Sequence, residues 1–116
     1  MANVSALSVR AGDVVIADFP GVEGTKRRPA LVVSSATYHL ARPDTILCVL
    51  TGQVASAVAP TDYHLQDWRA AGLRTPTAFR AFLVTLPRQD LVAVIGHLSD
   101  RDWSAVQARL QLAISA

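Results

Sequence analysis

Residues 13–34 read DVVIADFPGVEGTKRRPALVVS, which places two β-rich runs on either side of a turn-forming segment. The first run, 13–19, is rich in Val and Ile and ends at Pro20-Gly21, a dipeptide typical of turns. The second run, 29–34, is apolar enough to be buried on both faces of a sheet. This stretch therefore predicts two neighbouring strands, joined by a loop that ends in three consecutive cations.

The rest of the chain continues this pattern of short strands and ends in one helix. We predict a helical turn at 36–40, a short helix at 67–71 capped by Gly72, and strands at 45–50, 61–65, 77–86 and 91–95. Ser99 and Asp102 resemble a helix-capping box. The apolar stripe of that last helix would be Trp103, Val106, Leu110 and Ile114. The pattern favours an antiparallel barrel or sheet, mainly β with a C-terminal α-helix, over a doubly wound α/β fold.

Length and composition predict one folded domain, spanning 1–116. Of the 116 residues, 51% are hydrophobic and 17% are charged, which excludes a disordered chain. The charged fraction is low for a monomer, so we expect a second subunit, giving a homodimer. The single Cys48 cannot form an intramolecular disulfide, and we find neither a membrane-spanning run nor a signal peptide. We expect a cytoplasmic location without membrane contact.

The cations are concentrated in two basic islands, although the net charge is only +2. Ten of the eleven cations are Arg, whose planar fork suits phosphate recognition. The first island is 26–28, and the second is the acid-free stretch 68–89, which contains Arg69, Arg74, Arg80 and Arg88. This distribution predicts a localised anion-binding face.

Two short motifs could place polar groups beside such a face. Pro29 restricts Arg28 to an extended backbone, which would give that guanidinium a defined direction. Thr51-Gly52-Gln53 ends the apolar strand 45–50 with a hydroxyl and an amide. A solvated hairpin tip and an ordinary turn, respectively, would explain the same residues.

The histidines do not form a recognisable catalytic or metal-binding pattern. A two-histidine ribonuclease needs two imidazoles on one phosphate, and a metal site needs three or four ligands. The spacings of His39, His64 and His97 predict neither. We expect structural or surface roles for them, no bound metal and no cofactor.

A further set of motifs spans nearly the whole chain. The N-terminal half contains Gly12-Asp13, Asp18-Phe19, Glu23, the run Arg28–Ser34, Tyr38, and Leu47–Val49 leading to Thr51. The C-terminal half adds Gly72–Pro76, Arg80, Thr85-Leu86 and Gly96–Ser99. In this combination the chain resembles the MazF/PemK toxins of bacterial toxin–antitoxin systems.

The resemblance implies a fold and an activity. The fold is a small Src-homology-3-type antiparallel barrel of the CcdB/MazF/PemK kind, closed by a C-terminal helix and assembled as a homodimer. The activity is metal-independent, sequence-specific cleavage of single-stranded RNA, including mRNA. The family's catalytic arginine falls on Arg28, and its catalytic threonine or serine falls on Thr51. A cognate MazE-like antitoxin would occupy the same groove with a disordered acidic C-terminal segment.

The resemblance also implies substrate contacts. Glu23 matches a loop acid of some members, and Arg80 matches an arginine of the Kid-like branch. That branch usually has Asp two residues later, where this chain has Phe82. We further expect substrate contacts from Lys26, Arg27 and Gln53, and we expect loop 54–60 to meet unstacked bases.

Two alternatives to the ribonuclease remain open at this point. Phe82 is compatible with an RNA-binding member of the same fold that cleaves weakly or not at all. A CcdB-like toxin would instead act on a protein such as DNA gyrase through its terminal helix, which would leave the basic islands without a role.

Overall fold

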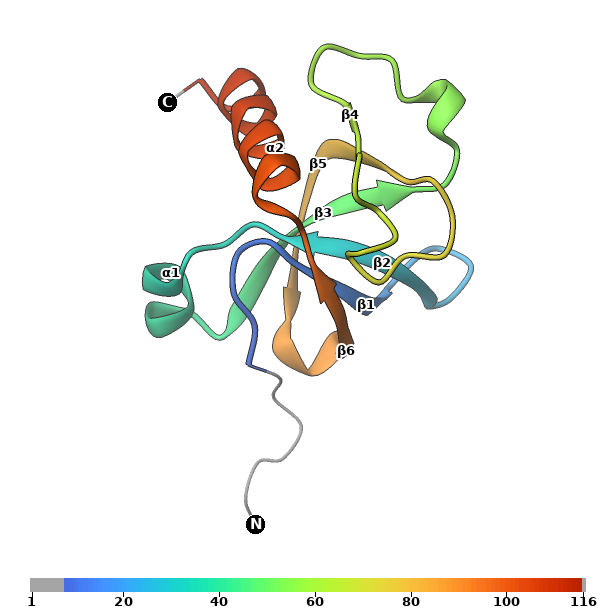
Figure 1. Ribbon diagram of the computed structural model, residues 1–116. Coiled ribbons are helices and arrows are strands. Elements are labelled where there is room, and N and C mark those ends of the chain that lie inside the picture. Colours follow the sequence, from blue (N-terminus) through green and yellow to red (C-terminus); the bar gives the residue numbers. More distant parts are fainter. Residues whose placement is uncertain (1–7, 116) are drawn as a thin grey trace.

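Residues 8–115, which the computed structural model describes, contain six strands in one antiparallel sheet. The strands lie in the order β4-β5-β3-β2-β1-β6 (Figure 1). Their bounds are β1 Asp13–Phe19, β2 Lys26–Val32, β3 Asp44–Thr51, β4 Tyr63–His64, β5 Ala78–Pro87 and β6 Leu91–His97. The helices are α1 Ala36–Ala41 and α2 Asp100–Ala113, with 3-10 turns at Val54–Ser56 and Arg88–Asp90. The predicted fold class, mainly β and antiparallel with a C-terminal helix, is confirmed.

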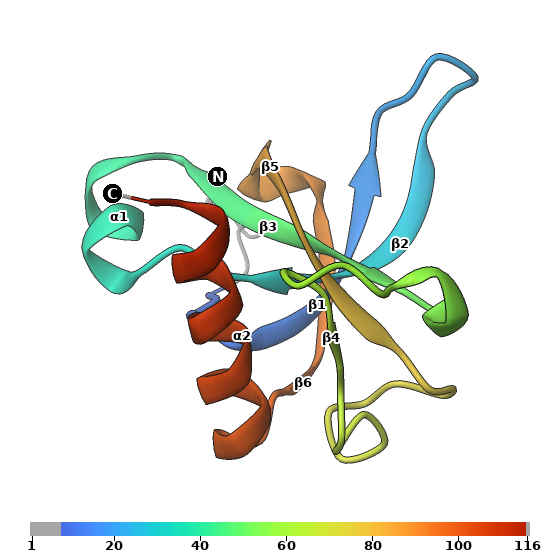
Figure 2. The same ribbon diagram turned by 90° about the horizontal axis from the view of Figure 1, so that it is seen from above.

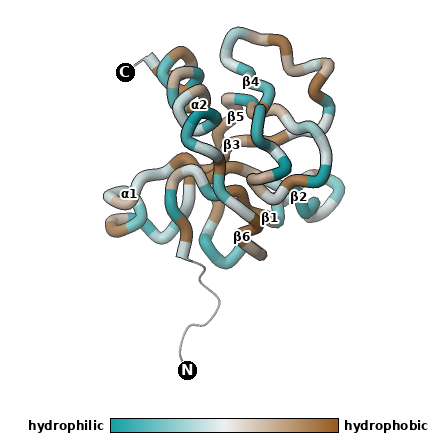
Figure 3. The backbone as a smooth tube through the Cα atoms, in the orientation of Figure 1, coloured by the Kyte–Doolittle hydropathy of each residue, from teal (hydrophilic) through white to brown (hydrophobic). Residues whose placement is uncertain are grey.

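The two faces of the sheet carry separate apolar clusters, because successive side chains of a strand point to opposite faces. Val14 and Leu31 belong to the cluster that packs against Val106 of α2. Their neighbours Val15 and Ala30 belong to the other cluster. Figure 3 shows hydrophobic stretches along the central strands and a mixed pattern along α2. Helix α2 therefore covers one face of the sheet. The other face carries the second cluster and is not covered by α2.

The β1–β2 hairpin is longer than the sequence pattern predicted. Strand β2 begins at Lys26, three residues before the predicted start, and ends at Val32. Asp18 and Arg27 are paired across the hairpin, and their ion pair continues the ladder beyond the apolar run. The sequence pattern predicts that the three cations 26–28 end the loop, whereas cross-strand pairing makes them part of β2. Figure 2 shows this hairpin projecting from the rest of the molecule.

The predicted helix at 67–71 is wrong, but its cap is correct. Residues 66–72 form bends and turns. Gly72 has φ +88°, the backbone N–H of Leu73 donates to the carbonyl of Trp68, and that of Gly72 donates to Arg69. This is the Schellman pattern of a helix end. The segment contains the ending of a helix without a regular helix before it.

Helix α2 begins at the predicted cap and uses its second capping residue differently. The Ser99 hydroxyl accepts a hydrogen bond from the backbone N–H of Asp102, as expected. The Asp102 side chain is fully buried and bonds to the segment that follows β4. Ile114, predicted to continue the apolar stripe, lies beyond the last helical turn and is 49% exposed. Neither helix within residues 8–115 is long and apolar enough to span a membrane.

Candidate active site

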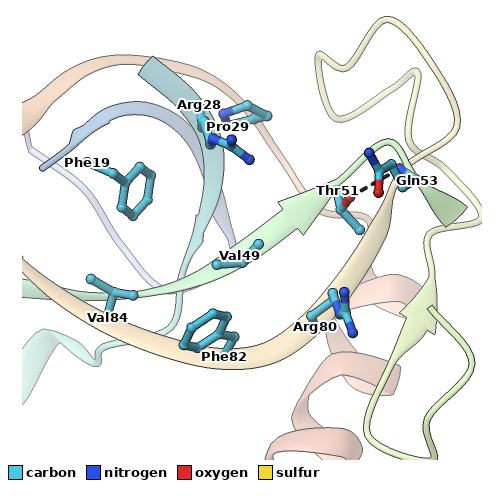
Figure 4. Close-up of a pocket in the computed structure, with 9 residues that line it drawn as sticks. All are labelled: Phe19, Arg28, Pro29, Val49, Thr51, Gln53, Arg80, Phe82 and Val84. Atoms are coloured by element: carbon cyan, nitrogen blue, oxygen red, sulfur yellow. Dashed lines mark hydrogen bonds between the residues drawn. The ribbon is translucent and has the colours of Figure 1, made fainter. Parts of the chain in front are cut away.

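A cleft of about 430 Å³ opens on the face of the sheet that α2 leaves free (Figure 4). It brings together side chains from β1, β2, β3 and β5 that are far apart in the sequence. The residues that line it are Phe19, Arg28, Pro29, Val49, Thr51, Gln53, Arg80, Phe82 and Val84. Four of the predicted site residues are among them, namely Arg28, Thr51, Gln53 and Arg80.

Strands β2 and β3 separate where this cleft begins. Their ladder pairs only Ala30–Val32 with Leu47–Val49. Pro29 is the next residue along β2, and it has no backbone N–H with which to continue a ladder. Extending the register by two residues sets Arg28 opposite Thr51, on the face that carries Ala30. The strands therefore diverge at Pro29 and leave these two side chains on either side of the cleft.

The Thr51 hydroxyl is held by the turn that follows β3. Its Oγ1 accepts a hydrogen bond of 3.1 Å from the backbone N–H of Gln53, drawn as the dashed line in Figure 4. A hydroxyl that accepts one bond still has its own O–H to donate. The turn thus fixes the oxygen and leaves a donor available for a ligand.

The two arginines of the cleft differ in their surroundings. Within residues 8–115, no acid lies within ion-pair distance of Arg28. Arg80 approaches Asp62 with its Nε at 3.8 Å, and the same carboxylate accepts a bond from the backbone N–H of Ala59. Asp62 therefore ties the loop before β4 to Arg80, whereas the Arg28 guanidinium is open to an anion.

Three predicted substrate residues lie outside the cleft. Glu23 is exposed in the turn of the β1–β2 hairpin, and Lys26 is exposed at the start of β2. Arg27 points to the face opposite Arg28 and forms two hydrogen bonds, of 2.8 and 3.0 Å, with the Asp18 carboxylate. This contact raises the pKa of Arg27 and lowers that of Asp18. The hairpin thus presents Arg28 and Arg27 to opposite sides.

The three histidines bond within the scaffold and do not line the cleft. His39 contacts the Ser34 hydroxyl, and burial together with the nearby Arg88 lowers its pKa. His97 Nδ1 lies 2.8 Å from the Asp13 carboxylate, and His64 Nε2 lies 2.9 Å from the Ala57 carbonyl oxygen. In the described part of the chain, no three His, Cys, Asp or Glu side chains are grouped so that they could hold a metal ion.

Five of the nine lining residues were not predicted as site residues, namely Phe19, Pro29, Val49, Phe82 and Val84. Val49 and Val84 belong to strand patterns that indicate core positions, so no sequence signal separates them from buried residues. Phe82 offered a signal, because the resemblance described above implies Asp at this position, two residues after Arg80. It is 66% exposed, which is unusual for a large apolar side chain in the middle of a strand.

The model of the PemK-like, MazF-like toxins of type II toxin–antitoxin systems matches residues 10–114. The chain belongs to this family. As a MazF-like toxin it has the expected architecture and carries its arginine–threonine cleft on the face away from α2. None of the curated proteins compared with this toxin matches it significantly.

Solved toxin structures share the fold. An endoribonuclease from a mycobacterial species, in complex with its cognate antitoxin, has a TM-score of 0.76 at 18% identity and covers 93% of this chain and 96% of that chain. A MazE–MazF structure from Deinococcus radiodurans has a TM-score of 0.75 at 20% identity and covers 94% and 98%. The Mycobacterium tuberculosis toxin MazF-mt6 has a TM-score of 0.72 at 20% identity and covers 87% and 94%. The likeness thus extends over nearly the full length of each chain.

Proposed function

We propose that this MazF-like toxin is a metal-independent endoribonuclease that cleaves single-stranded RNA, including mRNA, at short sequences. The observation that carries the proposal is the pairing of Arg28 and Thr51 across one open cleft. A cation that pairs with no acid among residues 8–115 and a hydroxyl with a free donor suit a phosphodiester, because both groups can bond its non-bridging oxygens. Family membership and the endoribonucleases among the solved relatives support the same reaction class.

The reaction can use the nucleophile that RNA itself contains. The 2′-hydroxyl attacks the adjacent phosphorus, the bond to the 5′-oxygen breaks, and the products are a 2′,3′-cyclic phosphate and a 5′-hydroxyl. Arg28 holds the non-bridging oxygens and stabilises the charge that develops on the phosphorane. Thr51 donates a hydrogen bond to the same group.

The proposed mechanism needs no histidine. A guanidinium has no acceptor for a proton, so Arg28 acts as a clamp and not as a simple general base. Without a titrating acid–base pair, the cleavage rate should rise with hydroxide concentration and should not form a bell centred near neutrality. Arg80, Lys26 and the exposed edge of Arg27 would hold flanking phosphates, while Gln53 and Glu23 would contact the substrate nearby.

Two protein partners complete the proposal. The solved relatives include complexes with antitoxins, and an acidic segment of a cognate MazE-like antitoxin would compete with RNA for Arg28. Exposed apolar side chains, among them Val92 and Val94 on one face of β6, support a homodimer. Both partners, and the mRNA substrate, point to action in the cytoplasm.

The test is cleavage of a long unstructured RNA in the presence of a chelator, followed by mapping of the ends. We expect discrete cuts with 5′-hydroxyl ends from the wild type and a loss of about 100-fold or more for Arg28→Ala. Arg42→Ala is the matched control, since Arg42 is an exposed arginine at the end of α1, away from the cleft. RNA that is bound but left intact would establish the non-cleaving alternative instead.

A further inference from the structure

Phe82 lines the cleft from a point where strand β5 bulges. The register pairs Cys48 with Leu83 and Val49 with Arg80, so Ala81 and Phe82 have no partner in β3. Arg80, Phe82 and Val84 alternate along β5 and therefore face the cleft together. Phe82 is 66% exposed there. A large aromatic ring is thus displayed at the site without being used by the core.

A second ring lines the same cleft from another strand. Phe19, at the end of β1, is half-buried against the cluster that contains Val15 and Ala17. Figure 4 shows Phe19 and Phe82 on separate strands with Val49 between them, and Arg28 in the same cavity. The cleft therefore combines a cation with an aromatic and aliphatic surface.

This combination matches the two parts of a nucleotide. A guanidinium binds a phosphate, while aromatic side chains bind the flat face of an unstacked base, and single-stranded RNA is recognised in this way. Phe82 can neither donate nor accept a proton, so it can contribute only through contact area and orientation. An apolar ring at a position where the Kid-like relatives usually have Asp exchanges a polar group for a stacking surface.

We propose that Phe82, together with Phe19, stacks on the nucleobase next to the phosphate that Arg28 binds, and so positions the nucleotide for cleavage. The inference rests on the proposed ribonuclease function and adds the group that positions the nucleotide. Stacking accepts every base, since each has a flat π-face, and its strength depends on the base. Phe82 is thus a positioning residue that favours a well-stacking base at one place in the target.

The test is a cycle of protein and RNA variants around a mapped cleavage site. The probe is a short oligoribonucleotide with a 2′-deoxy sugar at the cleaved nucleotide, which removes the nucleophile and allows equilibrium binding. A series of such probes lacks one base at a time. Phe82→Ala should weaken binding of the intact probe about tenfold or more, and Phe82→Trp should restore it. When the probe lacks the base that Phe82 contacts, the wild type and Phe82→Ala should bind that probe with equal affinity.

The controls separate stacking from other roles of Phe82. Leu40→Ala removes another exposed apolar side chain, 90% exposed on α1 and outside the cleft, and should not change RNA binding. Phe82→Ala should keep the thermal stability of the wild type, because the ring is largely in solvent. Cleavage by Phe82→Ala should show a raised KM or a lowered kcat that Phe82→Trp reverses.

Several results would overturn the inference. An equal loss with every probe, or no loss with any, would show that Phe82 does not stack on one base. A change confined to antitoxin binding or to dimer assembly would show that the ring serves a protein partner. If the wild type cleaves RNA and Phe82→Ala binds and cleaves it equally well, this inference alone is wrong. If the wild type neither binds nor cleaves RNA, the proposed function is wrong as well.

Discussion

The cleft and the contact between α2 and the segment after β4 both contain polar groups, but these groups are satisfied differently. In the α2 contact, the buried Asp102 carboxylate accepts bonds from the Tyr63 hydroxyl and from the backbone N–H groups of Gln66 and Asp67, at 2.7, 3.0 and 2.8 Å. In the cleft, Arg28 has no acid within ion-pair distance among residues 8–115.

Polar groups that maintain the fold are thus bonded within the protein, whereas polar groups that are available to a ligand are left open. A buried carboxylate costs free energy unless its acceptors are used, so the fully bonded Asp102 stabilises the folded state only as part of its network. An exposed guanidinium costs little to leave unpaired, since water solvates it until an anion replaces that water. Substitutions in the α2 contact should therefore change stability, and substitutions in the cleft should change activity.

The largest effect is expected from Arg28→Lys. The charge remains, but the planar fork that bonds two phosphate oxygens is lost. We expect single-turnover cleavage to fall about 100-fold, while the free energy of unfolding stays within about 0.5 kcal/mol of the wild type. Nearly normal cleavage would mean that only the charge of Arg28 matters. A loss of stability would mean that the cleft, like the α2 contact, maintains the fold.

The next largest effect is expected from Asp102→Ala. The change leaves the Tyr63 hydroxyl and two backbone N–H groups without their acceptor. The free energy of unfolding, measured by urea denaturation, should fall by about 2–3 kcal/mol. Asp100→Ala is the matched control, since Asp100 is exposed in the same helical turn, and it should cost no more than about 0.5 kcal/mol. Cleavage per folded molecule should be unchanged in both variants.

The sequence predicted most of the fold because the signals were local. Alternating and continuous apolar runs gave the strands, and Ser99 gave the start of α2. The sequence also predicted that Arg28 and Thr51 belong to one site, although only through the family resemblance. The β3–β5 bulge at Ala81 and Phe82 depends on pairing between distant strands, so no local pattern reveals it. The burial of Asp102 depends in the same way on a segment more than thirty residues earlier in the chain.

A smaller effect in the cleft is expected from Thr51→Val, which keeps the shape of the side chain and removes its hydroxyl. The hydrogen bond to the charged phosphate is lost, together with the bond that the hydroxyl accepts from the backbone N–H of Gln53, so cleavage should slow about tenfold. Thr51→Ser keeps the hydroxyl and should restore most of the rate. Single-turnover rates with the same oligoribonucleotide measure both changes. A Val variant as active as the wild type would show that Arg28 acts without this donor.

The smallest effect is expected at the exposed edge of the α2 contact, and it depends on pH. Hydrogen bonds from Arg101 and then from the Ser99 hydroxyl lower the pKa of Asp67 to about 2. The same carboxyl in the unfolded chain has a pKa of about 3.9. The folded state therefore binds the proton less tightly, so this contact stabilises the protein above about pH 4 and loses its contribution as the pH falls toward 2.

Arg101→Ala removes the first of these causes, so the Asp67 pKa should move back toward its ordinary value. Urea unfolding between pH 2 and 5 should show a small loss of stability at the upper end of the range that disappears at the lower end. The loss is small because Arg101 is exposed and Asp67 is only partly buried, so solvent screens the pair. Parallel curves for the variant and the wild type would show that Arg101 does not act through Asp67. The pH range over which the stability difference between the variant and the wild type changes, and not the size of that difference, would show that this ion pair stabilises the α2 contact.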